Sequence, residues 1–206
     1  MTFSADETNK IKKAPQVDGV LPLFHARWSP RAYAQKEVSP ALLHKLFEAA
    51  RWAPSSSNEQ PWRYIVGARG SSTYDKIFPT LVDGNKKWVQ NVPVLVLATT
   101  HSRFTKSGGE NRFAMHDLGA ASTSLALQAH ALGLVAHQMG GFDQEAARKA
   151  FDVPADYAIG SVIAIGYQGE AASLADERAI SQETSPRTRK PLNEMVYSAW
   201  DQPAEL

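Results

Sequence analysis

The segment that most constrains the fold of this chain is residues 113–132, "FAMHDLGAASTSLALQAHAL". It is long, rich in alanine and leucine, and apolar over most of its circumference when drawn as a helix. Small residues crowd one part of it, and Gly133 follows as a helix C-cap. A helix that is apolar almost all round belongs in a core or at a subunit interface. Because this one is too apolar for the surface of a small monomer, it also predicts a homodimer.

Apolar runs elsewhere predict the strands. Residues 91–98 and 159–167 are near-continuous apolar runs of strand length, and the partly β-branched residues 63–66 form a shorter one. A helix is expected to begin at the N-cap Ser39 and to end before Pro54. Strands and helices do not alternate in a repeating order, so the pattern favours an α+β fold over a doubly wound sheet.

The remaining segments are shorter and less regular. Further short helices are expected within residues 22–26, 71–90 and 143–153. Residues 99–111 are polar and contain glycines, which is typical of a mobile loop. No internal repeat or linker is visible in the sequence. We therefore expect a single domain over residues 21–206, preceded by a flexible N-terminal arm over residues 1–20.

The charge balance excludes some partners. The 206 residues include 22 lysines and arginines against 21 acidic residues, for a formal net charge of +1. This balance gives no electrostatic reason to expect a nucleic acid or an anionic membrane as the main partner. The N-terminus has neither a secretory signal nor a membrane-spanning run, so we expect a soluble, cytoplasmic protein.

Several catalytic classes lack their motifs. The absence of cysteine excludes disulfides, a thiol nucleophile and cysteine metal ligands. The sequence has no glycine-rich dinucleotide fingerprint, no phosphate-binding P-loop and no nucleophile-elbow serine. The six histidines show no metal-ligand spacing, and adjacent His116 and Asp117 should point to different faces of a helix. We expect no metal site.

Two basic clusters have a spacing suited to an anion. In an extended segment, every second side chain points the same way, so Arg27, Ser29 and Arg31 could converge on one anion. Arg187 and Arg189 repeat this alternation near the other end of the chain. A single cluster of this kind is more often a solvated basic patch, but two of them favour an anionic ligand.

A third feature is the stretch "APSSSNEQPW" at residues 53–62, called the polar loop below. Pro54 stops a helix and Pro61 precedes a strand, so both ends of the loop are restrained. Its composition is equally compatible with a solvated connector and with a set of short hydroxyl and amide groups that hold a ligand.

The chain resembles the nitroreductase family of flavoproteins in six segments. In chain order these are "RWSPRAY", "APSSSNEQPWRY", "VPVLVLA", "DLGAASTSLALQAHALGL", "MGGFD" and "RTRKPL". The resemblance covers residues 24–196 and implies an FMN-binding, domain-sharing homodimer. It also implies an α+β fold with a mostly antiparallel central sheet flanked by helices, and two active sites at the dimer interface. FMN would carry the redox chemistry, so no catalytic residue of the protein itself is required.

The resemblance implies a role for each matching position. The residues that it places around FMN are Arg27, Trp28, Ser29, Arg31, Pro54, Ser55, Ser56, Asn58, Gln60, Gly140, Gly141, Arg187 and Arg189. The phosphate would be bound by Arg27, Ser29, Arg187 and Arg189. Arg31 would stabilise negative charge at the pyrimidine edge of the flavin, and the polar loop would come from the partner subunit. The two glycines would let the backbone pass beside the flavin N5 edge. Trp28 departs from the pattern, which often has a second basic residue there, and residues 85–88 do not align clearly.

The family implies an NADH- or NADPH-dependent reductase of nitroaromatics, quinones or related small-molecule acceptors. Other flavin chemistry on the same fold, such as dehalogenation or enone reduction, and a flavin-binding dimer without turnover are the alternatives. A hydrolase would rest only on scattered serines and histidines. Phe104 and Phe113 are candidates for stacking on a substrate ring, and ordinary packing explains them equally well.

Overall fold

The computed structural model describes residues 3–205. Its centre is an antiparallel sheet with the strand order β1-β2-β4-β3. The strands are β1 (Trp62–Ala68), β2 (Val94–His101), β3 (Val135–Met139) and β4 (Tyr157–Gly166). The helices are α1 (Ala5–Lys12), α2 (Pro22–Ala26), α3 (Pro40–Arg51), α4 (Ser72–Ile77), α5 (Asp83–Val89), α6 (Ala114–Ala131), α7 (Gln144–Ala150) and α8 (Glu177–Thr184). The α+β class and the mostly antiparallel sheet predicted from the sequence are confirmed.

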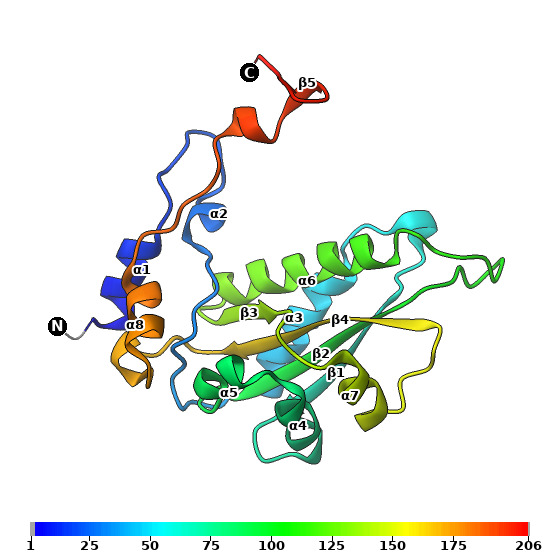
Figure 1. The fold of residues 1–206 in the computed structure, drawn as a ribbon, viewed down its shortest axis with the longest axis horizontal. Coiled ribbons are helices and arrows are strands. Elements are labelled where there is room, and N and C mark those ends of the chain that lie inside the picture. The colour runs from blue at the N-terminus through cyan, green and yellow to red at the C-terminus, as the bar shows by residue number, and fades with distance from the viewer. Residues whose placement is uncertain (1–2, 206) are drawn as a thin grey trace.

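Helices cover both faces of the sheet (Figure 1). Val94, Val96 and Ala98 of β2 belong to the core shared with α3 and α6. The alternate residues Leu95 and Leu97 belong to the core shared with α4, α5 and α7. Successive side chains of a strand point to opposite faces, so a strand buried on both sides needs apolar residues at every position. This explains why β2 reads as a continuous apolar run.

The helix α6 lies along one face of the sheet and buries one side of its surface. Leu118, Ala121, Leu125 and Ala129 are fully or almost fully buried. Met115 remains half exposed on the other side. The predicted central helix is therefore confirmed, and within residues 3–205 its outer face stays exposed at Met115.

The N-terminal arm predicted for residues 1–20 is wrong over Ala5–Lys12, which forms α1 packed against α8 (Figure 1). Ser4 and Glu7 form a capping box that stabilises the start of this helix. Thr8 is fully buried, because α8 covers that side of the helix. Residues 1 and 2 of the predicted arm lie outside the described residues.

Two further elements had no clear signal in the sequence. The strand β3 is only five residues long and includes His137 and Gln138, and α8 lies in a polar stretch. The predicted helix in residues 71–90 is in fact two helices, α4 and α5, joined by the 3-10 turn η2 (Phe78–Thr80). The polar residues after His101 fold back on themselves through an Arg103–Glu110 bridge.

Two other short 3-10 turns are η1 (Ser56–Asn58), within the polar loop, and η3 (Ala171–Ser173). Residues 191–205, called the C-terminal arm below, contain the 3-10 turn η4 (Leu192–Glu194) and a small hairpin of β5 (Tyr197–Ala199) and β6 (Gln202–Pro203). This arm stands away from the body of the molecule (Figure 1). No helix within residues 3–205 has the length and apolarity needed to cross a membrane.

Candidate cofactor site

Both predicted basic clusters line one cleft, called the anion cleft below, with a volume of about 210 Å³. The residues that line it are Lys12, Arg27, Trp28, Ser29, Arg31, Gln182, Arg187 and Arg189. Arg27 and Arg187 are 160 positions apart in the sequence, yet Arg187 Nη1 donates to the Arg27 carbonyl at 2.7 Å. The fold thus brings together all the residues of the two basic clusters that the sequence predicted. Lys12 and Gln182 join them without having been predicted.

Positive charge in this cleft is concentrated and partly buried. Burial lowers the pKa of Arg27, with a smaller contribution from nearby Arg189. Burial also lowers the pKa of Arg187, with repulsion from Arg27 and Arg189. Both arginines remain charged at neutral pH, since an arginine pKa starts above 12. Among the described residues, no carboxylate forms an ion pair with these three arginines. A bound anion with more than one negative charge would relieve the repulsion between the three arginines.

Arg187 also holds the cleft together. Its Nε donates to the Lys12 carbonyl at 2.5 Å, and its Nη2 donates to the His25 carbonyl. With the bond to Arg27, one guanidinium therefore binds three backbone carbonyls, one at the end of α1 and two at the end of α2. Arg187 would be more a scaffold of an anion site than a freely directed ligand.

A buried glutamate and a partly buried histidine fix the backbone beside Arg31. Glu183, which is 1% exposed, accepts hydrogen bonds from the backbone N–H groups of Arg31 at 2.9 Å and of Ala32 at 3.0 Å. His137 on β3 donates from Nδ1 to the Pro30 carbonyl at 2.8 Å. Burial lowers the pKa of His137 to about 4, so this ring is neutral and can keep its single N–H for Pro30. Neither group was predicted, because long-range backbone bonding leaves no signal in a sequence.

A line of contacts leads from this backbone to the predicted diglycine. The His137 ring stacks on Trp88 with 4.9 Å between centroids, and Trp88 Nε1 donates to Asn85 Oδ1 at 3.2 Å. Asn85 Nδ2 then donates to the Gly141 carbonyl at 2.9 Å. The segment 85–88, which could not be aligned, thus lies between the anion cleft and the diglycine.

The two glycines differ in their surroundings. A Cβ at Gly141 would lie 2.8 Å from Asn85 Nδ2, whereas a Cβ at Gly140 would meet nothing within 4 Å. Gly141 is therefore required by packing within the chain. Gly140 has no such requirement and leaves an open stretch of backbone, which suits the close approach of a ligand.

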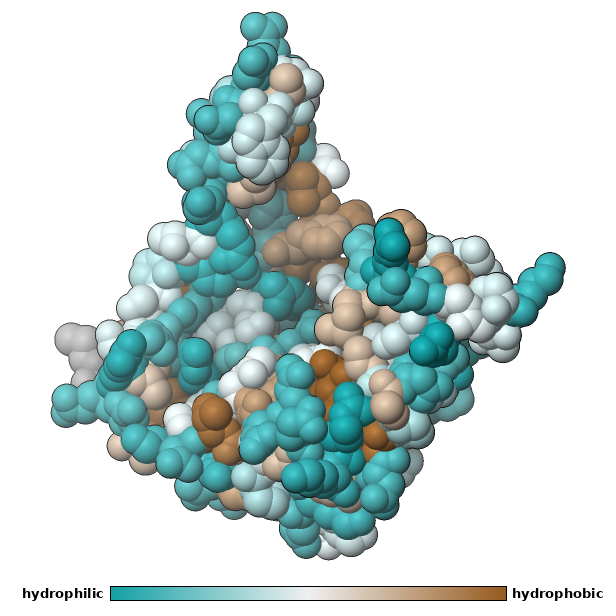
Figure 2. Space-filling model, turned by 45° about the vertical axis from the view of Figure 1, so that its right-hand side comes forward, coloured by the Kyte–Doolittle hydropathy of each residue, from teal (hydrophilic) through white to brown (hydrophobic). Residues whose placement is uncertain are grey.

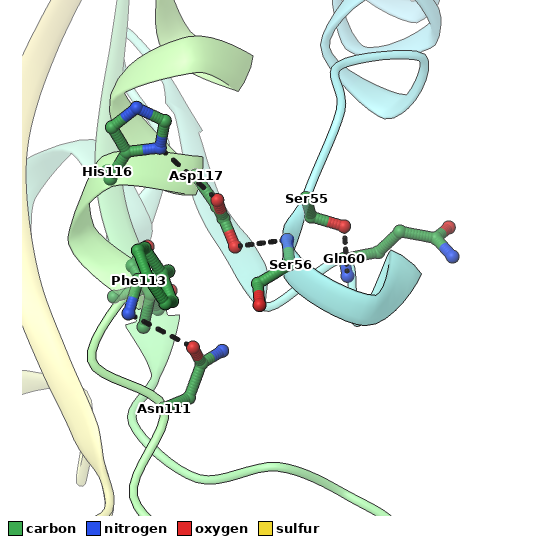
Figure 3. Close-up of polar contacts among 9 residues, drawn as sticks. Ser55, Ser56, Gln60, Asn111, Phe113, His116 and Asp117 are labelled. Carbon is green, nitrogen blue, oxygen red and sulfur yellow. Dashed lines mark hydrogen bonds and ion pairs between the residues drawn. The ribbon is translucent and has the colours of Figure 1, made fainter.

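The polar loop is held in a defined conformation by hydrogen bonds. Ser57, Asn58 and Gln60 all have φ between 48° and 54°, in the left-handed region that side chains rarely adopt. The Gln60 N–H donates to Ser55 Oγ at 3.0 Å, and the Ser56 N–H donates to the Asp117 carboxylate at 3.0 Å (Figure 3). Strained backbone persists where its surroundings hold it, and such positions cluster at ligand sites.

Asp117 anchors this loop to the first turn of α6. It is 3% exposed, and the helix N-terminus stabilises its charge. His116 lies on the exposed side, as expected, but its Nδ1 still reaches the Asp117 carboxylate at 3.4 Å (Figure 3). No pattern in the sequence pointed to this anchoring role.

The two candidate substrate residues lie near the polar loop and away from the anion cleft. Phe113 directly precedes α6 and is 57% exposed (Figure 3), and Phe104 lies in the folded-back segment after β2. The Thr105 N–H donates to the Glu59 carboxylate at 2.6 Å, which ties that segment to the polar loop. Both aromatic residues therefore share one end of the molecule with the loop.

The helix α2, which leads into the anion cleft, and the polar loop lie at opposite ends of α6 (Figure 1). Asp117 at the start of α6 holds the polar loop. The helix α2, which precedes Arg27, packs on α6. Near the end of α6, burial and the charge of Arg27 lower the pKa of His130. At 1.5 Å per residue, Asp117 and His130 are separated by roughly 20 Å along the helix. One chain therefore does not bring the two halves of the predicted site together.

Other features of the structure are less suited to a site. A cavity of about 490 Å³ is lined by residues of mixed charge, including Lys36, Glu37 and Arg69, and by none of the predicted cofactor residues. Within the described part of the chain, no group of three or more histidine and acidic side chains is arranged to hold a metal ion.

The fold and the cleft together define an α+β protein with a cleft rich in arginine. The chain belongs to the nitroreductase family: the family model described as "Nitroreductase family" matches residues 25–80 and 70–167. A protein of Methanothermobacter thermautotrophicus, provisionally named NADH dehydrogenase/NAD(P)H nitroreductase, is 32% identical over 176 residues, which cover 81% of this chain and 89% of that one.

Solved structures agree with the fold. A crystal structure of an oxidoreductase containing FMN superimposes with a TM-score of 0.83 at 32% identity, covering 90% of this chain and 94% of that one. A nitroreductase-like protein of Desulfovibrio desulfuricans, solved in complex with FMN, has a TM-score of 0.70 at 24% identity, covering 89% and 98%. The second likeness shows the fold alone.

Proposed function

We propose that this protein is an FMN-dependent oxidoreductase that uses NADH or NADPH to reduce nitroaromatics, quinones or related electron acceptors. The observation that carries this proposal is the anion cleft, where Arg27, Arg187 and Arg189 converge without a carboxylate partner among the described residues. When bound, FMN would supply the redox chemistry, a ping-pong hydride transfer through the flavin N5.

The residues present fit one end of FMN. Complete small-molecule sites occupy roughly 300–1,000 Å³, so a cleft of about 210 Å³ suits a phosphate group and not a whole flavin. Arg27, Ser29 and Arg189 would bind the phosphate oxygens, with Arg187 holding the cleft in shape. Arg31, fixed through its backbone by Glu183, would place a positive charge at the pyrimidine edge. Gly140 would offer exposed backbone to the ring.

A homodimer would complete the site. In this arrangement the polar loop of one subunit, with Pro54, Ser55, Ser56, Asn58 and Gln60, would meet the anion cleft of the other. The C-terminal arm supports an interface, because Leu192, Met195 and Trp200 are at least half exposed. Apolar surface also gathers in the hollow between this arm and the body (Figure 2). The expectation of a soluble, cytoplasmic protein stays a prediction.

The first experiment tests the cofactor and the donor. Purified protein should show a flavin absorbance spectrum that bleaches anaerobically on addition of NADH or NADPH and recovers with a nitroaromatic or quinone. Arg27→Met should raise the Kd for FMN about 10- to 100-fold, the effect of one lost hydrogen bond to a charged group. Arg178→Met is the matched control, because Arg178 is exposed on α8 and does not line the cleft. A wild-type protein that ignores FMN would refute the proposal, and one that binds FMN but is never reduced by nicotinamide would be a flavin-binding protein without turnover.

The second experiment tests whether the site is shared. Arg27→Met damages the cleft and Ser56→Trp damages the polar loop, so neither homodimer should retain FMN. A mixed dimer of the two variants contains one intact cleft facing one intact loop only if each site draws on both subunits. Unfolding, mixing and refolding the two variants should therefore restore FMN binding in part. No recovery in mixed dimers would place both halves of the site in the same subunit.

A further inference from the structure

The N-terminal helix α1 is attached directly to the anion cleft. The Trp28 indole Nε1 donates to Asn9 Oδ1 of α1 at 2.8 Å. Arg187 Nε donates to the Lys12 carbonyl at the end of the helix at 2.5 Å. Two residues that line the cleft thus hold α1 against it, by contacts that span 19 and 175 positions of sequence.

Lys12 turns its side chain into this cleft. It is 7% exposed, its Nζ donates to the Gln182 carbonyl at 2.5 Å, and it lies 5.1 Å from the centroid of the Trp28 ring. The neighbouring lysines of the same segment, Lys10 and Lys13, are exposed. The burial of Lys12 is therefore specific to this position.

The charge of Lys12 is offset by one nearby carboxylate, that of Glu183. Burial lowers the pKa of Lys12 most, Glu183 raises it, and Arg187 and Arg31 lower it further. Glu183 is already engaged by the backbone N–H groups of Arg31 and Ala32. A buried ammonium next to arginines is costly unless an anion joins it. A phosphate monoester carries about −1.5 to −2 charges at pH 7 and three acceptor oxygens, which matches this need.

We propose that Lys12 is a further ligand for the phosphate group of the cofactor, so that α1 forms one wall of the binding site. This inference rests on the proposed function and deepens it. The ammonium has three N–H donors, of which the Gln182 carbonyl takes one. The others can reach a phosphate held between Arg27 and Arg189. The alternative is a purely structural lysine, which ties α1 to α8 through Gln182 and packs on Trp28.

FMN and riboflavin separate these two roles, because they differ only in the phosphate. Lys12→Gln keeps an N–H donor for the Gln182 carbonyl and removes the charge; Lys12→Met is a second variant, and Lys12→Arg restores the charge. Each is titrated as the full chain with FMN and with riboflavin, and Tm is measured alongside. Lys10→Met is the control, since it makes the same change of charge at an exposed position of α1.

For Lys12→Gln we expect the Kd for FMN to rise about 10- to 100-fold, while the Kd for riboflavin changes less than about 3-fold. Lys12→Arg should recover most of the loss, and Lys10→Met should match the wild type. An unchanged ratio of FMN to riboflavin affinity in both Lys12→Gln and Lys12→Met would overturn the inference, including the case in which both ligands weaken together with Tm. A wild-type protein that binds riboflavin as tightly as FMN would instead remove the phosphate site, and with it the proposed function.

Discussion

Glu183 offers a sharp test of how the site is held together. Its carboxylate comes from α8 and accepts the backbone N–H groups of Arg31 and Ala32, at 2.9 and 3.0 Å. The glutamate is 1% exposed and Ala32 is 1% exposed, so water does not replace these bonds. Glu183→Ala would leave two backbone donors without a partner in a buried environment.

The magnitude follows from those two donors. An unsatisfied buried polar group costs about 1–3 kcal/mol, so Glu183→Ala should lower the free energy of unfolding by roughly 2–6 kcal/mol. Domains of ordinary stability have about 5–15 kcal/mol in total. The variant should therefore remain folded but lose a large part of its stability. Glu183→Gln keeps an oxygen that can accept both N–H groups, and we expect it to stay within about 1 kcal/mol of the wild type.

Urea unfolding measures the stability, and FMN titration measures the site. Glu183 does not itself line the cleft, but it holds the backbone of Arg31, which does, so the FMN affinity of each variant should depend on how well that variant keeps Arg31 in place. Glu183→Ala should weaken FMN binding, and Glu183→Gln should not. Equal stability of the Ala variant and the wild type, or equal losses for Ala and Gln, would refute this account of Glu183.

Three further predictions follow from the same contacts. His137 has a pKa near 4 against an ordinary value of 6.5, so its contribution to stability is complete above pH 6.5 and is lost as pH falls toward 4. The loss amounts to at most roughly 3 kcal/mol, and a His137→Gln variant, compared by urea unfolding across this range, should lack it. Gly141→Ala should cost about 1–3 kcal/mol in unfolding experiments, because the new Cβ displaces Asn85, while Gly140→Ala should be close to neutral. Asp117→Ala should release the polar loop and weaken FMN retention in a gel-filtration assay, and undiminished retention would show that the loop keeps its shape without this anchor.

Periodicity and apolar runs predicted the centre of the fold. The strands β2 and β4 are buried on both faces, and α6 is among the longest apolar segments, so each carries a strong signal in the sequence. The short strand β3 could not be found in this way, because it lies at the edge of the sheet and contains His137 and Gln138. α1 and α8 were missed for a related reason: both are short, polar helices that are stabilised by each other.

The candidate site also contains residues that the sequence predicted and residues that it did not. The arginines and Ser29 were predictable, because alternation in an extended segment brings side chains to one side. Lys12, Glu183 and Asp117 were not, since each acts on a segment that is far away in the sequence. A buried carboxylate that accepts backbone N–H groups has no local pattern. Its partners become visible only when the chain is folded.

The outer face of α6 connects the fold to the proposed dimer. Met115, Gly119 and Thr123 follow one another at intervals of about one turn and are exposed. Two copies packed antiparallel along this face would place the start of one α6 beside the end of the other, and so the polar loop of each subunit beside the anion cleft of its partner. Within one chain a Cβ at Gly119 would meet nothing within 4 Å. Gly119→Phe should therefore leave the monomer folded, since phenylalanine has a higher helix propensity than glycine.

The same substitution should separate the subunits, because the new ring would stand where the partner helix approaches. Light scattering should report a monomer and FMN should be lost, whereas Lys149→Phe, which places the same ring at an exposed position of α7, should leave both the dimer and the cofactor in place. A dimeric Gly119→Phe variant that retains FMN would show that the subunits meet on another face. The polar loop and the anion cleft would then have to be joined by a different arrangement of the two chains.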